Sequence, residues 1–149
     1  MKILKTVMMT WLLASSVRAD EILVITGINT SIKAVSSKQI KNIFLRKTLL
    51  NEDGSSWIPL NLSLEDPLRR AFSQSLFGQT PDEMETYWNE QYFHGIAPPY
   101  VVQSEEAMLR LVADSQGAIG YILPCHLDKR VKVIYRLAIS EPLNKGCNK

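Results

Sequence analysis

The chain has 149 residues, of which 46% are hydrophobic and 21% are charged, with seven glycines and seven prolines. These proportions are typical of one globular domain, and they exclude collagen, low-complexity disorder and a protein with several membrane spans. The formal charge of +2 comes from 17 Lys and Arg against 15 Asp and Glu. This excess is too small to indicate a nucleic-acid-binding protein.

Residues 1–19 have the pattern of a cleaved secretory signal. Lys2 and Lys5 precede a mostly apolar run, and Val17-Arg18-Ala19 offers a cleavage site to a signal peptidase. The alternative is an uncleaved anchor, but the apolar run is only half of the ~20 residues that span a bilayer. Cleavage removes three basic residues and no acid, which leaves 14 basic against 15 acidic residues. We therefore expect a periplasmic protein with one domain, residues 20–149, and no stable membrane insertion after cleavage.

Two cysteines, Cys125 and Cys147, are too few for a disulfide scaffold and lack the spacing of a zinc site. An exported chain meets an oxidising compartment, where a bond between them would tie the C-terminal tail to the body. Closing a loop of about 22 residues contributes on the order of 3 kcal/mol. Two unpaired thiols are the alternative, and we favour the disulfide because no third cysteine competes.

The first half of the mature chain predicts two strands and one helix. The sequence EILVITG at 21–27 is a continuous apolar run, which is typical of a buried strand inside a sheet. A capping box beginning at Ser36 predicts a helix over 37–45. The apolar run 57–62 predicts another strand, and Pro59 places it at an edge or at a bulge.

Two further helices are predicted between residues 66 and 93. Asp66 is a suitable N-cap, with Pro67 at the first helical position and Gly78 at the end. A second capping box starts at Thr80 and predicts a helix to about Phe93. Its apolar and aromatic residues recur at helical spacing and are interpreted as core. These residues are Met84, Tyr87, Trp88, Gln91 and Tyr92.

The remaining elements complete the predicted fold. Ser104 caps a helix that ends near Ser115. The sequence GAIGYI at 117–122 predicts a short strand whose internal glycine marks the close approach of another part of the chain, and 131–137 predicts a last strand. Because strands alternate with helices, we expect an α/β sandwich with a mixed sheet.

The sequence carries none of the common catalytic motifs. GxSxG, a Walker loop, HExxH and GxGxxG are absent. The two histidines, His94 and His126, fall in predicted loops and indicate no metal site. Most pairs of adjacent acids lie at helix starts, where they stabilise the helix dipole. We therefore expect a protein that is not an enzyme and has neither cofactor nor metal.

One group of residues is typical of an anion site. The helix starts at Ser36 and Pro67 expose backbone amides. Basic residues lie in or near the first turn of each helix, namely Lys38, Lys41, Arg69 and Arg70. They oppose the helix dipole, and a bound anion would relieve that conflict. The alternative is a solvated basic face, which the acids Glu65 and Asp66 beside the second start favour.

Several short motifs along the chain have a characteristic order and spacing. They are Ile43-Phe44-Leu45, Asp53-Gly54 with Trp57-Ile58-Pro59, Leu68-Arg69 with Phe72, Tyr87-Trp88 with Phe93 and Gly95, and Gly117-Ala118-Ile119-Gly120-Tyr121. From Ile22 to Val133 the chain thereby resembles the phosphate-binding subunits of ABC importers, in particular short secreted relatives. The resemblance implies one lobe of a type 2 periplasmic binding protein. It also implies phosphate or a related oxyanion as ligand, and an ABC permease or another envelope protein as partner.

The chain departs from this family at the phosphate site. The resemblance implies a Ser-Gly-Thr turn at a helix start followed by a basic residue, whereas this chain reads Asp66-Pro67-Leu68-Arg69. Only the basic residue is kept, and a carboxylate at this place repels a dianion. The mature chain is also too short for two lobes. Our leading hypothesis is an exported solute-binding-protein-like domain for ABC-type uptake, which binds phosphate or a related oxyanion at Arg69 and the adjacent helix start. The alternative is an envelope interaction module that has lost its ligand. The candidate ligand-binding residues are Ser36, Lys38, Asp66, Arg69 and Arg70.

Overall fold

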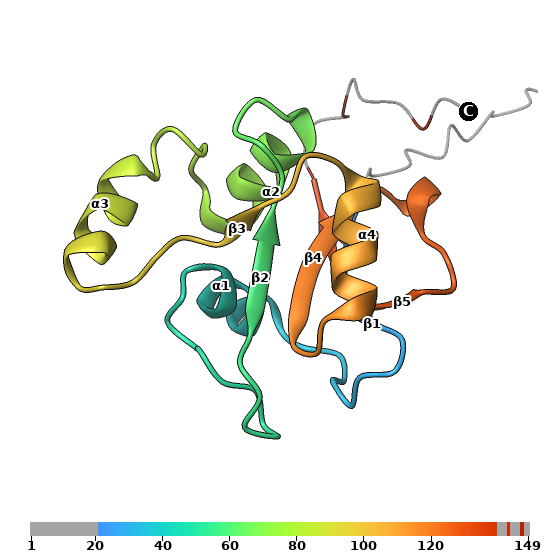
Figure 1. Cartoon of the computed structure of the whole chain (residues 1–149). Coiled ribbons are helices and arrows are strands. Elements are labelled where there is room, and N and C mark those ends of the chain that lie inside the picture. Colours follow the sequence, from blue (N-terminus) through green and yellow to red (C-terminus); the bar gives the residue numbers. More distant parts are fainter. Residues whose placement is uncertain (1–20, 140–142, 144–146, 148–149) are drawn as a thin grey trace, which may run out of the picture.

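A computed structural model of the chain describes residues 21–139, 143 and 147 (Figure 1). The predicted signal peptide lies outside the described residues. The backbone forms one five-stranded mixed sheet in the order β3-β2-β4-β1-β5. The strands are β1 (Glu21–Gly27), β2 (Ile58–Asn61), β3 (Tyr100–Val101), β4 (Ala118–Ile122) and β5 (Val131–Ala138). Strand β1 runs antiparallel to β4 and β5, while β2 is parallel to β3 and β4, so only β1 opposes the common direction.

Helices cover both faces of this sheet. They are α1 (Ser37–Phe44), α2 (Pro67–Phe77), α3 (Glu85–Phe93), α4 (Glu105–Asp114) and the short 3-10 helix η1 (Pro124–His126). Two neighbouring residues of β4 identify the layers, because successive strand residues point to opposite faces. A Cβ on Gly120 would overlap the Met108 side chain of α4. The ring of Tyr121 lies against Phe44 of α1 and Phe72 of α2. The fold is therefore the expected α/β sandwich, with α4 on one face and α1 and α2 on the other.

Most predicted elements are confirmed close to their predicted bounds. Strand β1 is hydrogen-bonded on both sides and is buried from Ile22 onward, as its unbroken apolar run predicts. Helix α1 follows the capping box of Ser36, α2 follows Asp66 and α4 follows Ser104. The local capping signals therefore fixed where these three helices begin.

The strand containing Pro59 differs from the prediction in one respect. Strand β2 is not at the edge of the sheet, because the two-residue strand β3, which the sequence did not reveal, lies outside it. Strand β3 pairs only with Leu60 and Asn61. The amide of Ile58 donates to the carbonyl of Gly117, directly before β4, so the nitrogen of Pro59 faces the other side, which β3 does not reach. Locally, Pro59 therefore still lies at an open edge.

The prediction that the aromatic stripe of α3 is core was wrong. None of the residues of α3 is buried; Tyr92 is 73% exposed and Phe93 is 86% exposed. Of the residues in the predicted stripe, only Met84, in the turn before the helix, is buried. The capping-box bonds between Thr80 and Glu83 are present, but they close that turn and the helix begins two residues later. Figure 1 shows the cause, since α3 lies beyond the β3 end of the sheet, and only Tyr87, Trp88 and Gln91 of the helix are half-buried.

The C-terminal segment is tied to the body by a disulfide. Cys125 and Cys147 are bonded, with their Cα atoms 5.8 Å apart, which is the pairing that the sequence favoured. Ile139 is buried, and Leu143 packs against the hydrophobic core. Within the part of the chain that the structure describes, no helix has the length and apolar character needed to cross a membrane.

Candidate functional site

The candidate site lies at the edge of the sheet where the parallel strands end. Ligands of open α/β sheets bind outside the carboxyl ends of the strands. At this edge β2 continues into the loop 62–66 and then into α2, β3 leads to the start of α4, and β4 leads to η1. We call this region the carboxyl edge.

The start of α2 is closed by its own N-cap. The Asp66 carboxylate accepts a hydrogen bond from the Leu68 amide at 2.8 Å. The next position, Pro67, has no amide hydrogen to offer. The Arg70 amide already donates to the Asp66 carbonyl at 3.1 Å. An anion arriving at this helix start would meet a carboxylate and few available amides.

The guanidinium of Arg69 is turned toward the protein. Its Nη1 donates to the Leu62 carbonyl oxygen at 2.7 Å, and the side chain is half-buried. Burial lowers the pKa of Arg69 below its ordinary value. Together with Asn61 and Phe72 it lines a cavity of about 20 Å³. A water molecule needs at least about 10–15 Å³ of such space, so this cavity has room for about one water molecule and little more.

Tyr121 fixes the loop that carries Arg69. Its hydroxyl accepts a hydrogen bond from the Leu62 amide at 3.2 Å and donates one to Asn61 Oδ1 at 3.1 Å. The ring stacks on Phe72 with centroids 3.9 Å apart and planes 8° from parallel. Burial raises the pKa of the phenol, so it remains protonated at neutral pH. The loop between β2 and α2 is therefore bonded to the middle strand of the sheet.

A second helix start at the same edge is also occupied. Glu105, at the first position of α4, is only 6% exposed. Its carboxylate accepts a hydrogen bond from the Leu123 amide at 2.7 Å and lies 3.0 Å from Nδ1 of His126. The Ser104 hydroxyl caps the Ala107 amide at 3.1 Å. Both helices that start here thus have a carboxylate of the chain itself at their first turn.

The other predicted site residues have partners or contacts elsewhere. Arg70 forms an exposed ion pair with Asp82 at 2.9 Å, beside α2. The Ser36 hydroxyl caps α1 through the Gln39 amide at 3.2 Å. Lys38 is exposed on α1, as is Lys41. Helix α1 begins next to the middle of β5, where Val35 donates to the Ile134 carbonyl at 3.2 Å. The α1 group and the α2 group therefore engage different parts of the protein.

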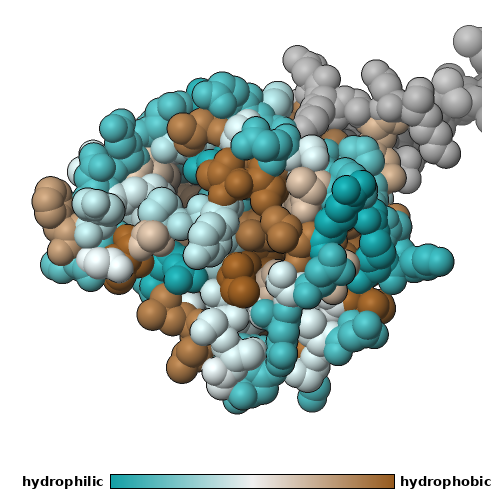
Figure 2. Space-filling model, viewed as in Figure 1, coloured by the Kyte–Doolittle hydropathy of each residue, from teal (hydrophilic) through white to brown (hydrophobic). Residues whose placement is uncertain are grey.

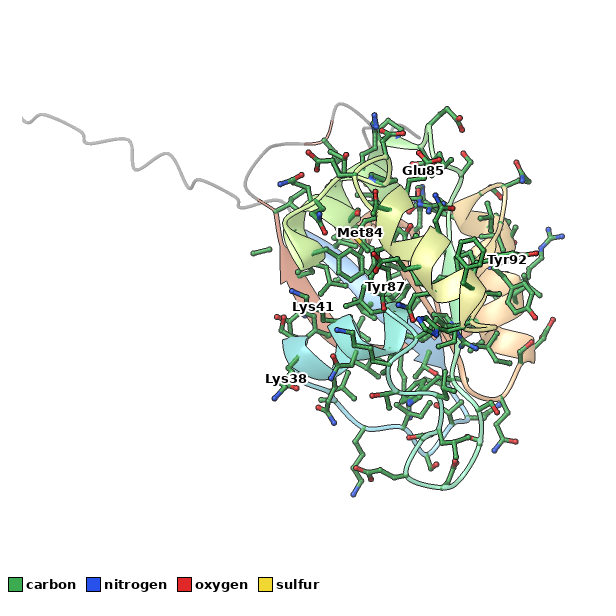
Figure 3. The ribbon with its side chains drawn as sticks, turned by 90° about the vertical axis from the view of Figure 1, so that its left-hand side faces the viewer. Lys38, Lys41, Met84, Glu85, Tyr87 and Tyr92 are labelled. Carbon is green, nitrogen blue, oxygen red and sulfur yellow. A yellow bond between two sulfur atoms is a disulfide. The ribbon has the colours of Figure 1, made fainter. Side chains whose placement is uncertain are left out.

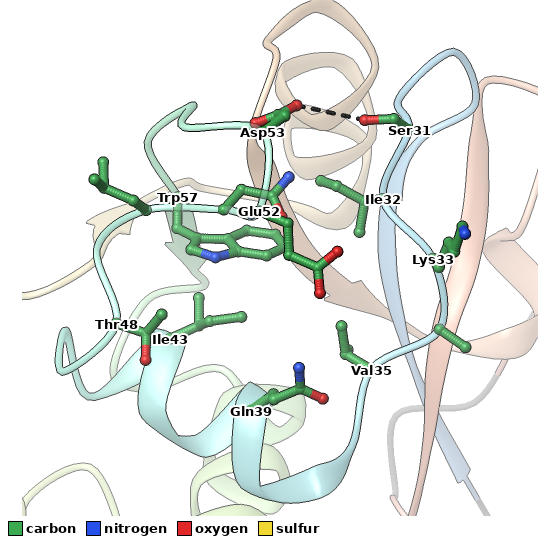
Figure 4. Close-up of a pocket in the computed structure, with 13 residues that line it drawn as sticks. Ser31, Ile32, Lys33, Val35, Gln39, Ile43, Thr48, Glu52, Asp53 and Trp57 are labelled. Carbon is green, nitrogen blue, oxygen red and sulfur yellow. Dashed lines mark hydrogen bonds between the residues drawn. The ribbon is translucent and has the colours of Figure 1, made fainter.

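An open hollow that the sequence analysis did not predict lies between α1, the loop 28–35 and the loop 48–57 (Figure 4). Its volume is about 590 Å³. The indole of Trp57 forms its buried wall, and the side chains of Glu52 and Gln39 extend into it. It is formed by three consecutive segments of the chain, whose lining residues all lie between Ser31 and Trp57, and no motif in the sequence marked it. Asp53, at its rim, bonds Ser55 and lies 3.4 Å from Ser31 Oγ.

The described residues include no cluster of three or more His, Cys, Asp or Glu that is arranged to hold a metal. His126 lies against Glu105, and His94 is exposed at the end of α3. At the carboxyl edge, the polar groups around Arg69 therefore form hydrogen bonds with other groups of the same chain.

The chain was compared with protein families, curated proteins and solved structures. No protein-family model matches the chain, and no curated protein matches it. Solved structures do match. A putative phosphate ABC transporter substrate-binding protein with bound phosphate, from Clostridium perfringens, matches with a TM-score of 0.64 and 21% identity over 77% of this chain and 44% of that one. The chain has the fold of one lobe of such a binding protein.

Two further structures support the same fold. An ABC-type phosphate transport receptor from Vibrio cholerae matches with a TM-score of 0.64 and 20% identity, over 77% of this chain and 45% of that one. A possible phosphate binding protein from Planctomyces limnophilus matches with a TM-score of 0.57 and 12% identity, over 77% of this chain and 40% of that one. This chain therefore spans less than half the length of the proteins that it matches.

Proposed function

We propose that the chain is an exported, one-lobed relative of solute-binding proteins that works by contacting another envelope protein and neither carries an oxyanion nor catalyses a reaction. The observation that carries this proposal is the 2.8 Å hydrogen bond from the Leu68 amide to the Asp66 carboxylate. It fills the helix start at which the resemblance implies a phosphate.

The physical argument rests on charge and on hydrogen-bond donors. A carboxylate at the helix start repels a phosphate dianion, and it already uses the favourable end of the helix dipole. Arg69, the one basic residue that the resemblance keeps, gives a hydrogen bond to the Leu62 carbonyl. Freeing it would leave that carbonyl without this donor, and a buried polar group without a partner costs about 1–3 kcal/mol.

Export to the periplasm is part of the proposal. The signal pattern of residues 1–19 supports it, as does the bond between Cys125 and Cys147, because disulfides persist in oxidising compartments. The partner would be an ABC permease or another envelope protein. Contact would occur at the carboxyl edge, where Leu64 is exposed in the loop between β2 and α2.

A second candidate function is weak oxyanion binding at Arg69. The solved neighbour from Clostridium perfringens contains phosphate, and Arg69 does lie at a helix start of this chain. Such binding would require the Arg69 side chain to leave Leu62 and the anion to approach Asp66.

Calorimetry with phosphate and with sulfate on the mature protein separates the two candidates. We expect no binding heat from the wild type. We expect measurable phosphate binding once the helix start is opened in an Asp66→Ser, Pro67→Gly variant. Glu65→Ser is the matched control, because it removes an exposed acid next to the cap but leaves the cap in place. Wild-type binding that Arg69→Ala abolishes would establish the second candidate and reject the first.

A further inference from the structure

Helix α3 has a surface that its own domain does not use. The helix contains two tyrosines, a tryptophan and a phenylalanine, yet none of its residues is buried. It is attached by the buried Met84 in the preceding turn, by the half-buried Trp88, which lines the small cavity beside Phe44 and Phe72, and by the Tyr87 hydroxyl, which donates to the Leu45 carbonyl at 2.7 Å. In Figure 2, apolar residues reach the surface at this end of the molecule. Aromatic side chains that are exposed together on one helix are typical of a protein–protein interface.

The charges around this helix are separated by sign. No Lys or Arg occurs between Ala71 and Leu109, and α3 carries exposed carboxylates at Glu85 and Glu90. Helix α1 has the opposite character, since Lys38 and Lys41 are exposed and the helix contains no acid. The bond from Tyr87 to Leu45 joins the two helices, because Leu45 directly follows α1.

Figure 3 shows these side chains on one side of the molecule, with Lys38 and Lys41 on α1 and with Glu85, Tyr87 and Tyr92 on α3. We call this surface the α1–α3 face. One part of it is basic, another is acidic, and aromatic rings lie in or beside the acidic part. A surface with a positively charged part and a separate negatively charged part can be complementary to the same surface of a second copy.

We propose that the α1–α3 face binds a second copy of this chain in a two-fold symmetric dimer. An axis passing near Tyr87 sets the α1 lysines of one copy against the α3 glutamates of the other, and each contact occurs twice, as two-fold symmetry requires. The dimer would cover rings such as that of Tyr92, which is 73% exposed in the single chain. This proposal goes beyond the proposed function and does not rest on it, because the carboxyl edge is a separate surface.

The separation of charges favours a second copy over a different protein. A partner that recognised α3 alone would need basic residues, and such a partner would be repelled by Lys38 and Lys41 on the same face. A second copy satisfies both parts at once. Since the paired charges lie at an exposed surface, the dimer would weaken as salt concentration rises.

Sedimentation equilibrium of the mature protein at low and high salt tests the proposal. We expect a monomer–dimer equilibrium that weakens with salt. Reversing the acidic part with Glu85→Lys and Glu90→Lys should weaken the dimer at least about tenfold, as should reversing the basic part with Lys38→Glu and Lys41→Glu. An equimolar mixture of the two double variants should form a mixed dimer, because both of its α1–α3 contacts pair opposite charges, and the chain carrying all four changes should dimerise again to within about threefold of the wild type.

Two observations would overturn the proposal. One is a wild type that stays monomeric up to about 1 mM, where even a millimolar complex would be populated. The other is a four-change variant that remains as weak as the double variants although its circular dichroism shows it to be folded. Asp114→Lys is the matched control, since it reverses an exposed acid at the end of α4, on the other face of the sheet from α1, and should leave the equilibrium unchanged.

Discussion

Replacing Tyr121 with Phe removes one oxygen from the carboxyl edge and leaves the ring stacked on Phe72. In the wild type that oxygen accepts a hydrogen bond from the Leu62 amide at 3.2 Å and donates one to Asn61 at 3.1 Å. Leu62 is fully buried, so its amide loses its partner without gaining water. A buried donor left unsatisfied costs about 1–3 kcal/mol of unfolding free energy.

The expected shift in melting temperature follows from the size of the domain. With an unfolding entropy of about 2.1 cal/mol/K per residue, each 1 kcal/mol corresponds to roughly 4 °C for a domain of this size, so Tm should fall by about 4–12 °C. Urea denaturation followed by circular dichroism should give a lower midpoint with an unchanged slope, because the surface exposed on unfolding is the same.

Tyr100→Phe is the control for this substitution. Tyr100 is 73% exposed, so removing its hydroxyl should change stability by no more than about 0.5 kcal/mol. If the Tyr121 and Tyr100 variants were equally stable, the phenol of Tyr121 would not hold the loop between β2 and α2. The fixed position of Arg69 against Leu62 would then lack its structural cause.

Three further predictions concern the framework around the site. Gly117→Ala should destabilise the fold more than Gly54→Ala. Both glycines have positive φ, but only at Gly117 would a Cβ overlap a backbone carbonyl, that of Ser56 in the loop before β2. Urea denaturation of both variants measures the difference in unfolding free energy. Replacing Cys125 and Cys147 with Ala should lower the unfolding free energy by about 3 kcal/mol, which the same denaturation measures. Hydrogen bonds from two arginines lower the pKa of Glu106 to about 2, so the stabilisation from this carboxylate is present above its ordinary pKa of 4.5 and is lost as the pH falls toward 2. An NMR titration of the Glu106 carboxyl group should show this low pKa, and a value near 4.5 would contradict it.

The sequence predicted the framework well because its signals are local. The caps at Ser36, Asp66 and Ser104 each act within a single helical turn, so they do not depend on the rest of the fold. The apolar run of β1 required only that both faces of the strand be covered.

The sequence was less informative where burial depends on tertiary position. Helical spacing groups Tyr87 with Gln91 and Trp88 with Tyr92 on α3, but it cannot show how little of that helix the rest of the domain covers. In α4, helical spacing groups Leu111 with Met108 and Val112, whereas in the structure Leu109 is buried with them and Leu111 is 44% exposed. Strand β3 has only two residues, which is too short to leave a periodic pattern.

The sequence predicted which types of residue lie at the candidate site, but it did not predict the contacts that they form. The acid and the proline at the start of α2 could be recognised in the sequence, and Asp66 does cap the helix. That Arg69 turns back to Leu62, and that Glu105 closes the start of α4, depends on loops brought together by the parallel strands. No spacing in the sequence encodes these contacts.

The amide signal of Leu68 in the presence of phosphate tests most directly whether Asp66 closes the start of α2. We expect the Leu68 chemical shift of the wild-type protein to stay unchanged at about 10 mM phosphate, a concentration that would largely fill a site of millimolar Kd. A saturable shift at Leu68 and Arg69 that disappears in the Arg69→Ala variant would contradict the closed helix start.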